Sequence, residues 1–167
     1  MYVWGGHTQF LLEVGGDCCP IEDNLPNSDE SYMDVYNLSS RNWEQYPTSG
    51  DIPHVGDGPT MVGFEESLYV FGGFNDGVYI GDLYEFNTIT NTWSCVAMSD
   101  DAVKPSPRYG LGSVLYNEKI FIFGGISPLI DSLQLGAKYF SAQKFKRELT
   151  YGFNNEMFLF DIKKGSS

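Results

Sequence analysis

One pattern occurs three times along the chain: an apolar strand that runs into paired glycine. The copies are YVWGG at residues 2–6, LYVFGG at 68–73 and IFIFGG at 120–125. Nineteen glycines and eight prolines separate many short apolar runs, and no long stretch has helical periodicity. A recurring unit of this kind predicts a repeat architecture built from β-strands.

Each unit is predicted to hold up to four short strands, a to d, that run alternately up and down. In the central unit these strands cover residues 58–64, 67–73, 82–87 and 92–97. The third unit repeats the first half, with strands at 109–115 and 119–125. The tight turns between them, at 65–66, 88–91 and 117–118, are rich in residues that favour turns.

The glycine doublets and two tryptophans add detail to this pattern. Glycine reaches backbone angles closed to other residues and lets a second backbone or a ring approach closely, which predicts a packing role for each doublet. Trp43 follows Tyr36, and Trp93 follows Phe86, by the same seven residues. On strand d, rings of this size are expected to fill the space between neighbouring sheets.

These features resemble the kelch repeat, which implies an all-β fold of kelch-type β-propeller blades, four-stranded sheets set radially around a channel. On this basis residues 1–46 form a blade without its first strand, 58–97 a complete blade and 109–161 a blade without its last strand. Propellers generally need about 4–8 blades to close, so two partial blades flanking a complete one leave the ring incomplete. We expect 1–167 to be a partial propeller, either a fragment or a truncated gene model of a six- or seven-bladed protein. The alternative is an oligomer that completes the ring.

Composition is consistent with a packed domain and disfavours some partners. The apolar and aromatic contents, 42% and 16%, are ample for a core. The net charge of −12 is uneven, because residues 1–100 carry 16 acidic and 1 basic side chains whereas 101–167 carry 6 and 9. A strongly acidic chain disfavours nonspecific binding to nucleic acid or anionic membrane, so neither is expected as a partner.

Cysteine is sparse, with Cys18, Cys19 and Cys95. An odd, low count suits a reducing compartment better than a disulfide framework, which predicts an intracellular location in the cytoplasm, the nucleus or both. The adjacent pair lies near His7, but the spacing matches no zinc pattern. Ordinary thiols are therefore favoured over a metal site.

Two long connections between strands b and c, 7–31 and 126–154, are where function is expected, since function on such scaffolds is generally carried by loops. The first is acidic but lacks the ordered spacing of a calcium loop. The second mixes cations with rings, namely Lys138, Tyr139, Phe140, Lys144, Phe145, Lys146, Arg147, Tyr151 and Phe153. That mixture suits an acidic peptide or a terminal carboxylate. The alternative is that these rings fold the connection onto its own blade.

Catalytic chemistry has little support in the sequence. The two histidines, His7 and His54, belong to no recognisable metal or acid–base arrangement. A copper oxidase on kelch-like blades would need a Tyr/His/Cys set that is not found. We predict no catalytic residue, no metal ligand and no cofactor, and we do not expect an enzyme.

Several segments are similar to the subgroup formed by kelch domain-containing proteins 1 and 2, substrate receptors of cullin-RING ubiquitin ligases. The resemblance is carried by residues 2–6, by Trp43 with residues 48–53, by 111–125, and above all by the long connection that ends in GFNN at 152–155. It implies a receptor that captures protein C-termini, especially those ending in glycine, in a pocket at the propeller face.

The resemblance carries over only in part. An aromatic of the subgroup corresponds to Phe153, which keeps a ring, whereas a tyrosine corresponds to Ile126 and a lysine to Gly110. The arginines that hold the terminal carboxylate, and the segment that docks on the ligase, correspond to positions after Ser167. The chain by itself is therefore not expected to bind or ubiquitinate in the subgroup's manner.

The sequence thus predicts a protein-interaction module, and the resemblance implies part of a ligase substrate receptor for C-terminal degrons. The alternative is a structural or scaffolding kelch protein with a cytoskeletal or trafficking partner. The predicted ligand is a protein or peptide that binds noncovalently. The predicted peptide-binding residues are Arg108, Tyr109, Ile126, Lys144, Lys146, Arg147, Phe153 and Asn154, with Phe153 as an apolar wall and Arg108 or the 144–147 segment as anion partner.

Overall fold

The computed structural model describes residues 2–3, 31–53, 57–75, 78–97, 104–128, 139–141 and 151–165. Nearly all of their regular structure is β-strand, and one helical turn, α1 (Ile162–Gly165), follows the last strand. The predicted all-β class is confirmed. The glycine doublet of the first unit and most of the 7–31 connection lie outside the described residues.

The central unit contains four antiparallel strands that are neighbours in space. They are β4 (Thr60–Phe64), β5 (Ser67–Phe71), β8 (Leu83–Asn87) and β9 (Thr92–Cys95), with β5 between β4 and β8 and β8 between β5 and β9. Each is shorter at one end than the sequence predicted. For β5 the reason is that Gly72 and Gly73 take φ angles of 79° and 125°, which an extended strand does not accommodate.

The first and third units each contribute three strands. The first holds β1 (Tyr2–Val3), β2 (Ser31–Asn37) and β3 (Asn42–Gly50), and the third holds β10 (Gly112–Tyr116), β11 (Lys119–Phe123) and β15 (Met157–Asp161). β3 extends past residue 46, where the first unit was expected to end. Its last residues, Ser49 and Gly50, pair in parallel with β9, which joins the first and central units into one seven-stranded sheet.

The c-to-d turns of the first two units have the same chemistry. The side-chain oxygen of Asn87 accepts hydrogen bonds from the backbone N–H groups two and three residues later, at 2.9 and 3.0 Å. The side-chain oxygen of Asn37 accepts the equivalent bonds at 3.0 and 3.1 Å. An asparagine that caps its own turn in this way fixes the register between the strand before the turn and the strand after it.

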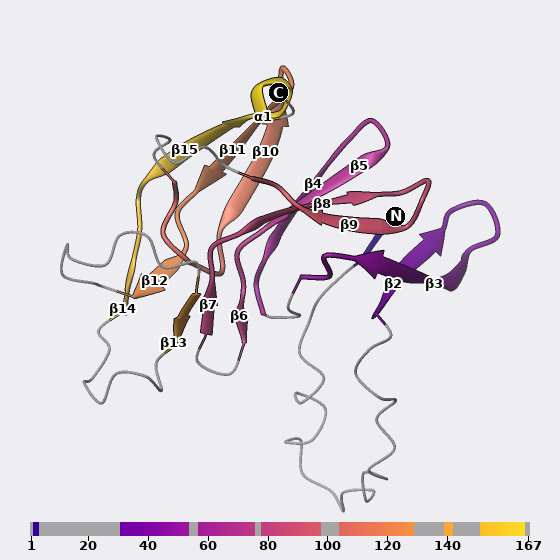
Figure 1. The fold of residues 1–167 in the computed structure, drawn as a ribbon, viewed down its shortest axis with the longest axis horizontal. Coiled ribbons are helices and arrows are strands. Elements are labelled where there is room, and N and C mark those ends of the chain that lie inside the picture. The colour runs from indigo at the N-terminus through magenta and orange to yellow at the C-terminus, as the bar shows by residue number, and fades with distance from the viewer. Residues whose placement is uncertain are drawn as a thin grey trace, which may run out of the picture.

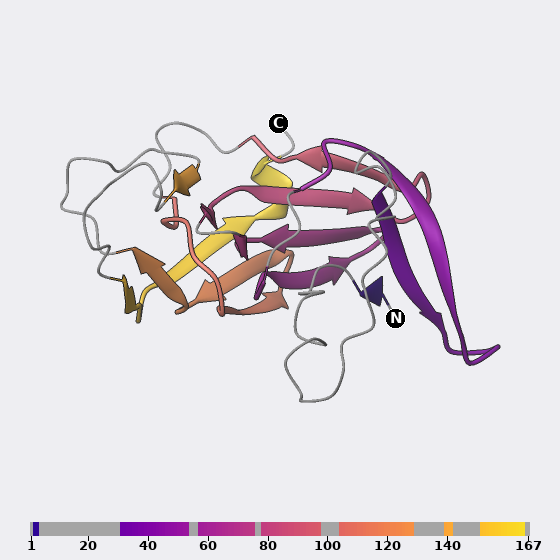
Figure 2. The same ribbon diagram turned by 90° about the horizontal axis from the view of Figure 1, so that it is seen from below.

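The sheets are arranged as a fan. In Figure 1 the central strands lie between the β2–β3 hairpin on one side and β10, β11 and β15 on the other, and Figure 2 shows the same order from below. Because the central sheet has a neighbour on each side, both of its faces are covered. Apolar residues therefore occur on both faces, as in strands buried on two sides.

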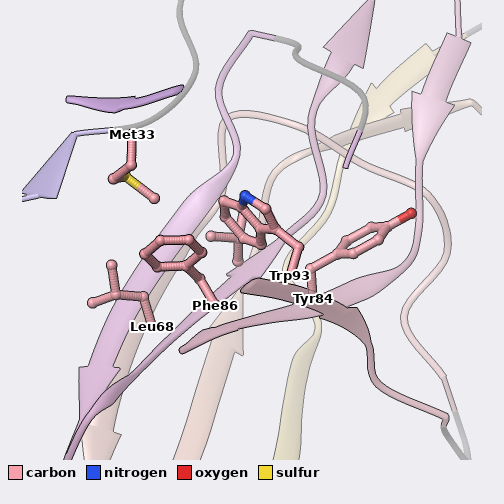
Figure 3. Packing of buried hydrophobic residues seen from close by; sticks show 6 residues of the cluster. Met33, Leu68, Tyr84, Phe86 and Trp93 are labelled. Atoms are coloured by element: carbon pink, nitrogen blue, oxygen red, sulfur yellow. The ribbon is translucent and has the colours of Figure 1, made fainter. Parts of the chain in front are cut away.

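One core lies between the first and central units (Figure 3). It is formed by Met33, Leu68, Val70, Tyr84, Phe86 and Trp93. Met33 comes from β2 and the others from β5, β8 and β9. The ring centroids of Phe86 and Trp93 are 4.8 Å apart, and these two residues are direct cross-strand partners. The seven-residue step between them thus places both rings on one face of the sheet.

A second core lies between the central and third units. Tyr69, Phe71 and Leu83 of the central sheet pack with Ile120, Ile122 and Ile162 of the third. Along β5 the side chains alternate, so residues 68 and 70 face the first unit while 69 and 71 face the third. Across this junction the hydroxyls of Thr60 and Ser113 share a hydrogen bond.

The glycine doublets allow close approach of another backbone segment. A Cβ added to Gly72 would lie 2.5 Å from the carbonyl oxygen of Arg108, and the Gly73 N–H donates to that same oxygen at 2.9 Å. A Cβ on Gly125 would lie 2.9 Å from the carbonyl oxygen of Tyr109. The packing role predicted for the doublets is confirmed for the two that the structure describes.

The two tryptophans have different surroundings. Trp93 is 2% exposed and fills the space between sheets, as expected. Trp43 contacts Tyr36 with ring centroids 5.2 Å apart but is 57% exposed. The expectation that both rings lie between two sheets is therefore wrong for Trp43, because it lies on the face of the first unit that points away from the central sheet.

Candidate functional site

The b-to-c connections of the central and third units gather at the end of the sheets opposite α1 (Figure 1). This loop end consists of β6 (Phe74–Asn75), β7 (Val78–Ile80), β12 (Ile126–Pro128), β13 (Tyr139–Ser141) and β14 (Tyr151–Phe153). β13 pairs antiparallel with β7, so the long connection of the third unit adds a strand to the short hairpin of the central unit. The described part of the 126–154 connection is thus largely strand.

A hydrogen-bonded bridge repeats at the loop end of both units. Asp57 bridges Phe74 in the central unit. In the third unit Tyr109 bridges Ile126, and both residues of this second pair lie 52 positions after their counterparts in the first pair. The Tyr109 N–H donates to the Ile126 carbonyl at 3.1 Å, and the Ile126 N–H donates back at 2.8 Å. The structure therefore places two of the predicted site residues, Tyr109 and Ile126, directly beside each other.

The segment around Ile126 contacts two more of the predicted site residues, Phe153 and Asn154. Phe153 is its cross-strand partner between β12 and β14. The backbone N–H of Asn154 donates to the carbonyl of Gly125 at 2.8 Å, and its side-chain amide donates to the buried Ser127 hydroxyl at 2.7 Å. Asn154 therefore holds the hairpin in place, and the strand backbone aims the neighbouring ring of Phe153 outward.

A cluster of three rings also lies at the loop end. Phe74 lies 4.9 Å from Tyr79 and 5.2 Å from Tyr109, and the two tyrosine rings are 5.7 Å apart, all between centroids. Burial raises the pKa of the Tyr79 hydroxyl above its ordinary value, and Tyr109 and Tyr151 reinforce the shift. The rings pack against one another, so Tyr109 acts here mainly as a cover for the central hairpin.

β14 displays an exposed aromatic surface beside this cluster. Phe153 is 90% exposed, and Tyr151, two residues earlier on the same side of the strand, is also exposed. Exposed rings next to a fixed backbone can contact apolar side chains of a bound peptide with little loss of side-chain freedom. The predicted role of Phe153 as an apolar wall is compatible with this position and stays a prediction.

Arg108 has a different role from the one the sequence suggested. Its side chain is fully buried, and its guanidinium donates to the Ser106 carbonyl and hydroxyl, to the Gly124 carbonyl and to the Glu156 carboxylate, all at 2.9–3.0 Å. Its Cζ also lies 5.0 Å from the ring centroid of Phe158. Four of its five N–H donors are thus used inside the protein. The expectation that Arg108 pairs with a ligand anion is corrected, because it instead ties residues 104–108 to the third sheet.

The other three predicted cations, Lys144, Lys146 and Arg147, lie outside the described residues. Sequence reasoning missed Phe74 and Tyr79, which the structure brings to Tyr109. The signal was present in the repeat, since Phe74 and Tyr79 stand at the positions of Ile126 and Phe153 in the third unit. That match appears only once the paired strands are known, because the intervening connection is much longer in the third unit.

Two features are absent from the part of the chain that the structure describes. No group of three or more His, Cys, Asp or Glu residues that could hold a metal ion occurs there. None of the helical structure there is long and apolar enough to cross a membrane. Among the cysteines, Cys95 is exposed and forms no disulfide, whereas the other two are outside the described residues.

Comparison with known proteins agrees with the repeat geometry. Residues 1–166 match the family model described as the KLHDC2/KLHL20/DRC7 Kelch-repeats domain. Kelch domain-containing protein 1 of Mus musculus and of Homo sapiens are each 28% identical to the chain over 98% of its length. The chain spans 38% of the length of these two relatives.

Two further relatives, which match less of the chain, have different names. The host cell factor homolog hcf-1 of Caenorhabditis elegans is 32% identical over 78% of the chain and 17% of its own length. A sulfolyase of Thlaspi arvense, N-(sulfonatooxy)prop-2-enimidothioate sulfolyase, is 28% identical over 70% of the chain and 34% of its own length. Kelch-repeat domains are typically non-enzymatic modules for protein–protein binding, and the enzyme name belongs to one relative, which matches 70% of the chain. The family match over residues 1–166, together with the repeated sheets and glycine doublets, shows that this chain belongs to the kelch-repeat family.

Proposed function

We propose that the loop end of this chain binds a peptide segment of another protein, as part of a ubiquitin-ligase substrate receptor that recognises protein C-termini. The observation that carries the proposal is the exposed aromatic surface of β14, where Phe153 is 90% exposed in a domain of a protein-binding family. The specific link to C-termini rests on the resemblance to kelch domain-containing proteins 1 and 2.

The geometry of β14 favours an extended ligand. Within the described residues β14 pairs on one edge only, with β12, and the proposed peptide would pair as a strand with its other edge. Addition of a strand to an open edge gives affinity through the backbone, and adjacent side chains give specificity. Tyr151 and Phe153 would then contact apolar side chains of the ligand.

A terminal carboxylate needs a cation near this surface. Since Arg108 is committed to internal hydrogen bonds, the proposed anion partners are Lys144, Lys146 and Arg147. These residues belong to the connection that leads into β14, which keeps them within a few residues of Tyr151 in the sequence. An intracellular location and a cullin-RING ligase as partner are parts of the same proposal.

Peptide titration followed by NMR tests this proposal. Peptides ending in glycine, each prepared with a free and an amidated C-terminus, are added to the wild-type chain and to Phe153→Ala. The chain is not expected to reproduce the binding of the complete subgroup receptors, so we expect only weak binding of the free acid, through Lys144, Lys146 and Arg147. This binding should shift the signals of Tyr151 and Phe153, and its affinity should be at least about fivefold lower for the variant, the effect of losing roughly 1 kcal/mol. Tyr116→Ala is the matched control, because Tyr116 is an exposed ring on β10, outside the loop end.

The outcomes separate the two levels of the proposal. Loss of binding on amidation supports capture of the C-terminus. Equal binding of both forms removes that role and leaves a peptide-binding scaffold. Binding that is unchanged by Phe153→Ala, or absent for every peptide, overturns the loop end as the site.

A further inference from the structure

The loop end already contains one extended segment that is docked on the edge of a hairpin. β7 has β6 on one edge and β13 on the other, and Figure 1 shows β13 beside β7. β6 and β7 form the short hairpin of the central unit, whereas β13 comes from the long connection of the third unit. β13 therefore occupies a hairpin edge in the way that the proposed peptide would.

The register of β13 on β7 places like residues opposite each other. Phe140 of β13 is the cross-strand partner of Tyr79, and Ser141 is the partner of Val78. The pairing is antiparallel, so Ser141 follows Phe140 toward the N-terminal end of β7. Directly opposite aromatic residues are among the cross-strand pairs that stabilise a sheet. The docked segment thus presents an aromatic residue to Tyr79 and a small one to the next position.

β14 repeats β7 in the third unit. Phe153 stands where Tyr79 stands, and Gly152 stands where Val78 stands. The edge of β14 away from β12 therefore corresponds to the edge of β7 that β13 occupies. An edge presents backbone N–H and C=O groups in the plane of the sheet, so it is a different surface from the faces on which neighbouring units pack.

We propose, resting on the function proposed above, that the peptide ligand pairs with this edge of β14 in the register that β13 has on β7. The ligand then runs antiparallel to β14, with an aromatic residue opposite Phe153 and a small residue opposite Gly152. Its last residue lies opposite Tyr151. The ligand class is a protein C-terminus with an aromatic side chain at the third position from its end, followed by two small residues.

The antiparallel direction agrees with the placement of charge along the chain. It brings the terminal carboxylate to the Tyr151 end of β14. Arg147 precedes Tyr151 by four residues, and four residues of chain span at most about 14 Å, so the 144–147 cations belong to this end. A parallel ligand would carry its carboxylate to the Asn154 end, away from these cations.

Two peptides of equal composition, KSFGG and KFSGG, test the register. Both have a free C-terminus, and they differ only in whether the ring is third or fourth from the end. In NMR titrations of the wild-type chain, KSFGG should bind at least about threefold more tightly, and Phe153→Ala should abolish this difference. Tyr116→Ala is the control and should keep the difference, because Tyr116 is on β10, outside the loop end.

Pairing as a strand has a second signature, in the peptide backbone. In an antiparallel pair, alternate residues exchange their N–H and C=O groups with the partner strand. Methylation of the backbone nitrogen of the phenylalanine of KSFGG, or of the glycine that follows it, should therefore have unequal effects. One of the two should weaken binding at least about fivefold, and the other should change it little.

The outcomes distinguish this ligand register from the function on which it rests. Equal affinities of KSFGG and KFSGG, or equal effects of the two methylations, overturn the register and leave peptide binding at the loop end in place. A preference for KSFGG that persists in Phe153→Ala overturns pairing with β14. Failure of every peptide to bind overturns both the register and the function proposed above.

Discussion

Tyr79 and Phe153 occupy the same position in successive units, yet Tyr79 is 5% exposed and Phe153 is 90% exposed. Each residue lies on the second strand of a loop-end hairpin, where its backbone pairs with a residue of the first strand. The ring of Tyr109 covers Tyr79 at 5.7 Å, and no described residue provides the same cover for Phe153. The exposure of this site is thus set by what lies over the hairpin, since both positions carry an aromatic side chain.

The contrast between the two tryptophans predicts unequal effects on stability. Trp93→Ala should lower the free energy of unfolding by about 3–5 kcal/mol, because it empties a closely packed space beside Phe86. Trp43→Ala, at the equivalent but exposed position, should cost about 1 kcal/mol or less. Urea unfolding of the wild type and of both variants measures these losses. Equal losses would contradict the assignment of Trp93 alone to a core.

The close approach at the central glycine doublet makes Gly72 intolerant of a side chain. Gly72→Ala should lower the free energy of unfolding by about 1–3 kcal/mol, because the backbone there is left-handed. The new Cβ would also meet the Arg108 carbonyl oxygen at 2.5 Å. Gly112→Ala is the control, because a Cβ there meets nothing within 4 Å. Thermal unfolding of the control should match or slightly exceed the wild type. A harmless Gly72→Ala would argue against this packing.

The buried guanidinium of Arg108 predicts a structural loss with substitution. Arg108→Met should lower the free energy of unfolding by about 3 kcal/mol, because it leaves the Gly124 carbonyl and the Ser106 groups without their donor. Glu156→Gln should cost only about 1 kcal/mol or less, since Glu156 is 54% exposed. Chemical denaturation of both variants gives the comparison. An Arg108→Met protein of normal stability that fails only in ligand binding would restore the ligand role.

The raised pKa of Tyr69 predicts a loss of stability at alkaline pH. Burial, followed by the charge of Glu85, raises the pKa of Tyr69 to about 12. The unfolded chain releases this proton near pH 10, so between pH 10 and about 12 the unfolded state binds fewer protons and the free energy of unfolding falls. The contribution is complete below pH 10. Tyr69→Phe removes it, so the stability difference between wild type and variant should change only within that window. A constant difference from about pH 9 to 12 would contradict the shift.

Much of the fold was predictable because its signals are local. The apolar run of β5 and the turn chemistry of Asn87 depend on residues within a few positions of each other. Strand ends were less well placed, since Gly72 and Gly73 leave the sheet to meet a connection more than thirty residues away. Of the predicted site residues, Tyr109, Ile126, Phe153 and Asn154 lie together in the structure, and their role in binding stays a prediction. Arg108 was misassigned because a charged residue gives no local sign that it will be buried.

The amino-acid sequence by itself determined the repeated unit: which segments become strands, where the turns fall, and which residues share a face of each sheet. These follow from side-chain period, turn formers and glycine, all of which act over short distances. Only the tertiary structure decided which faces are covered, so that Trp93 is in a core while Trp43 is exposed. The reason is that burial depends on the neighbouring sheet, and the same residue in the same repeat position has different energetics when that neighbour differs.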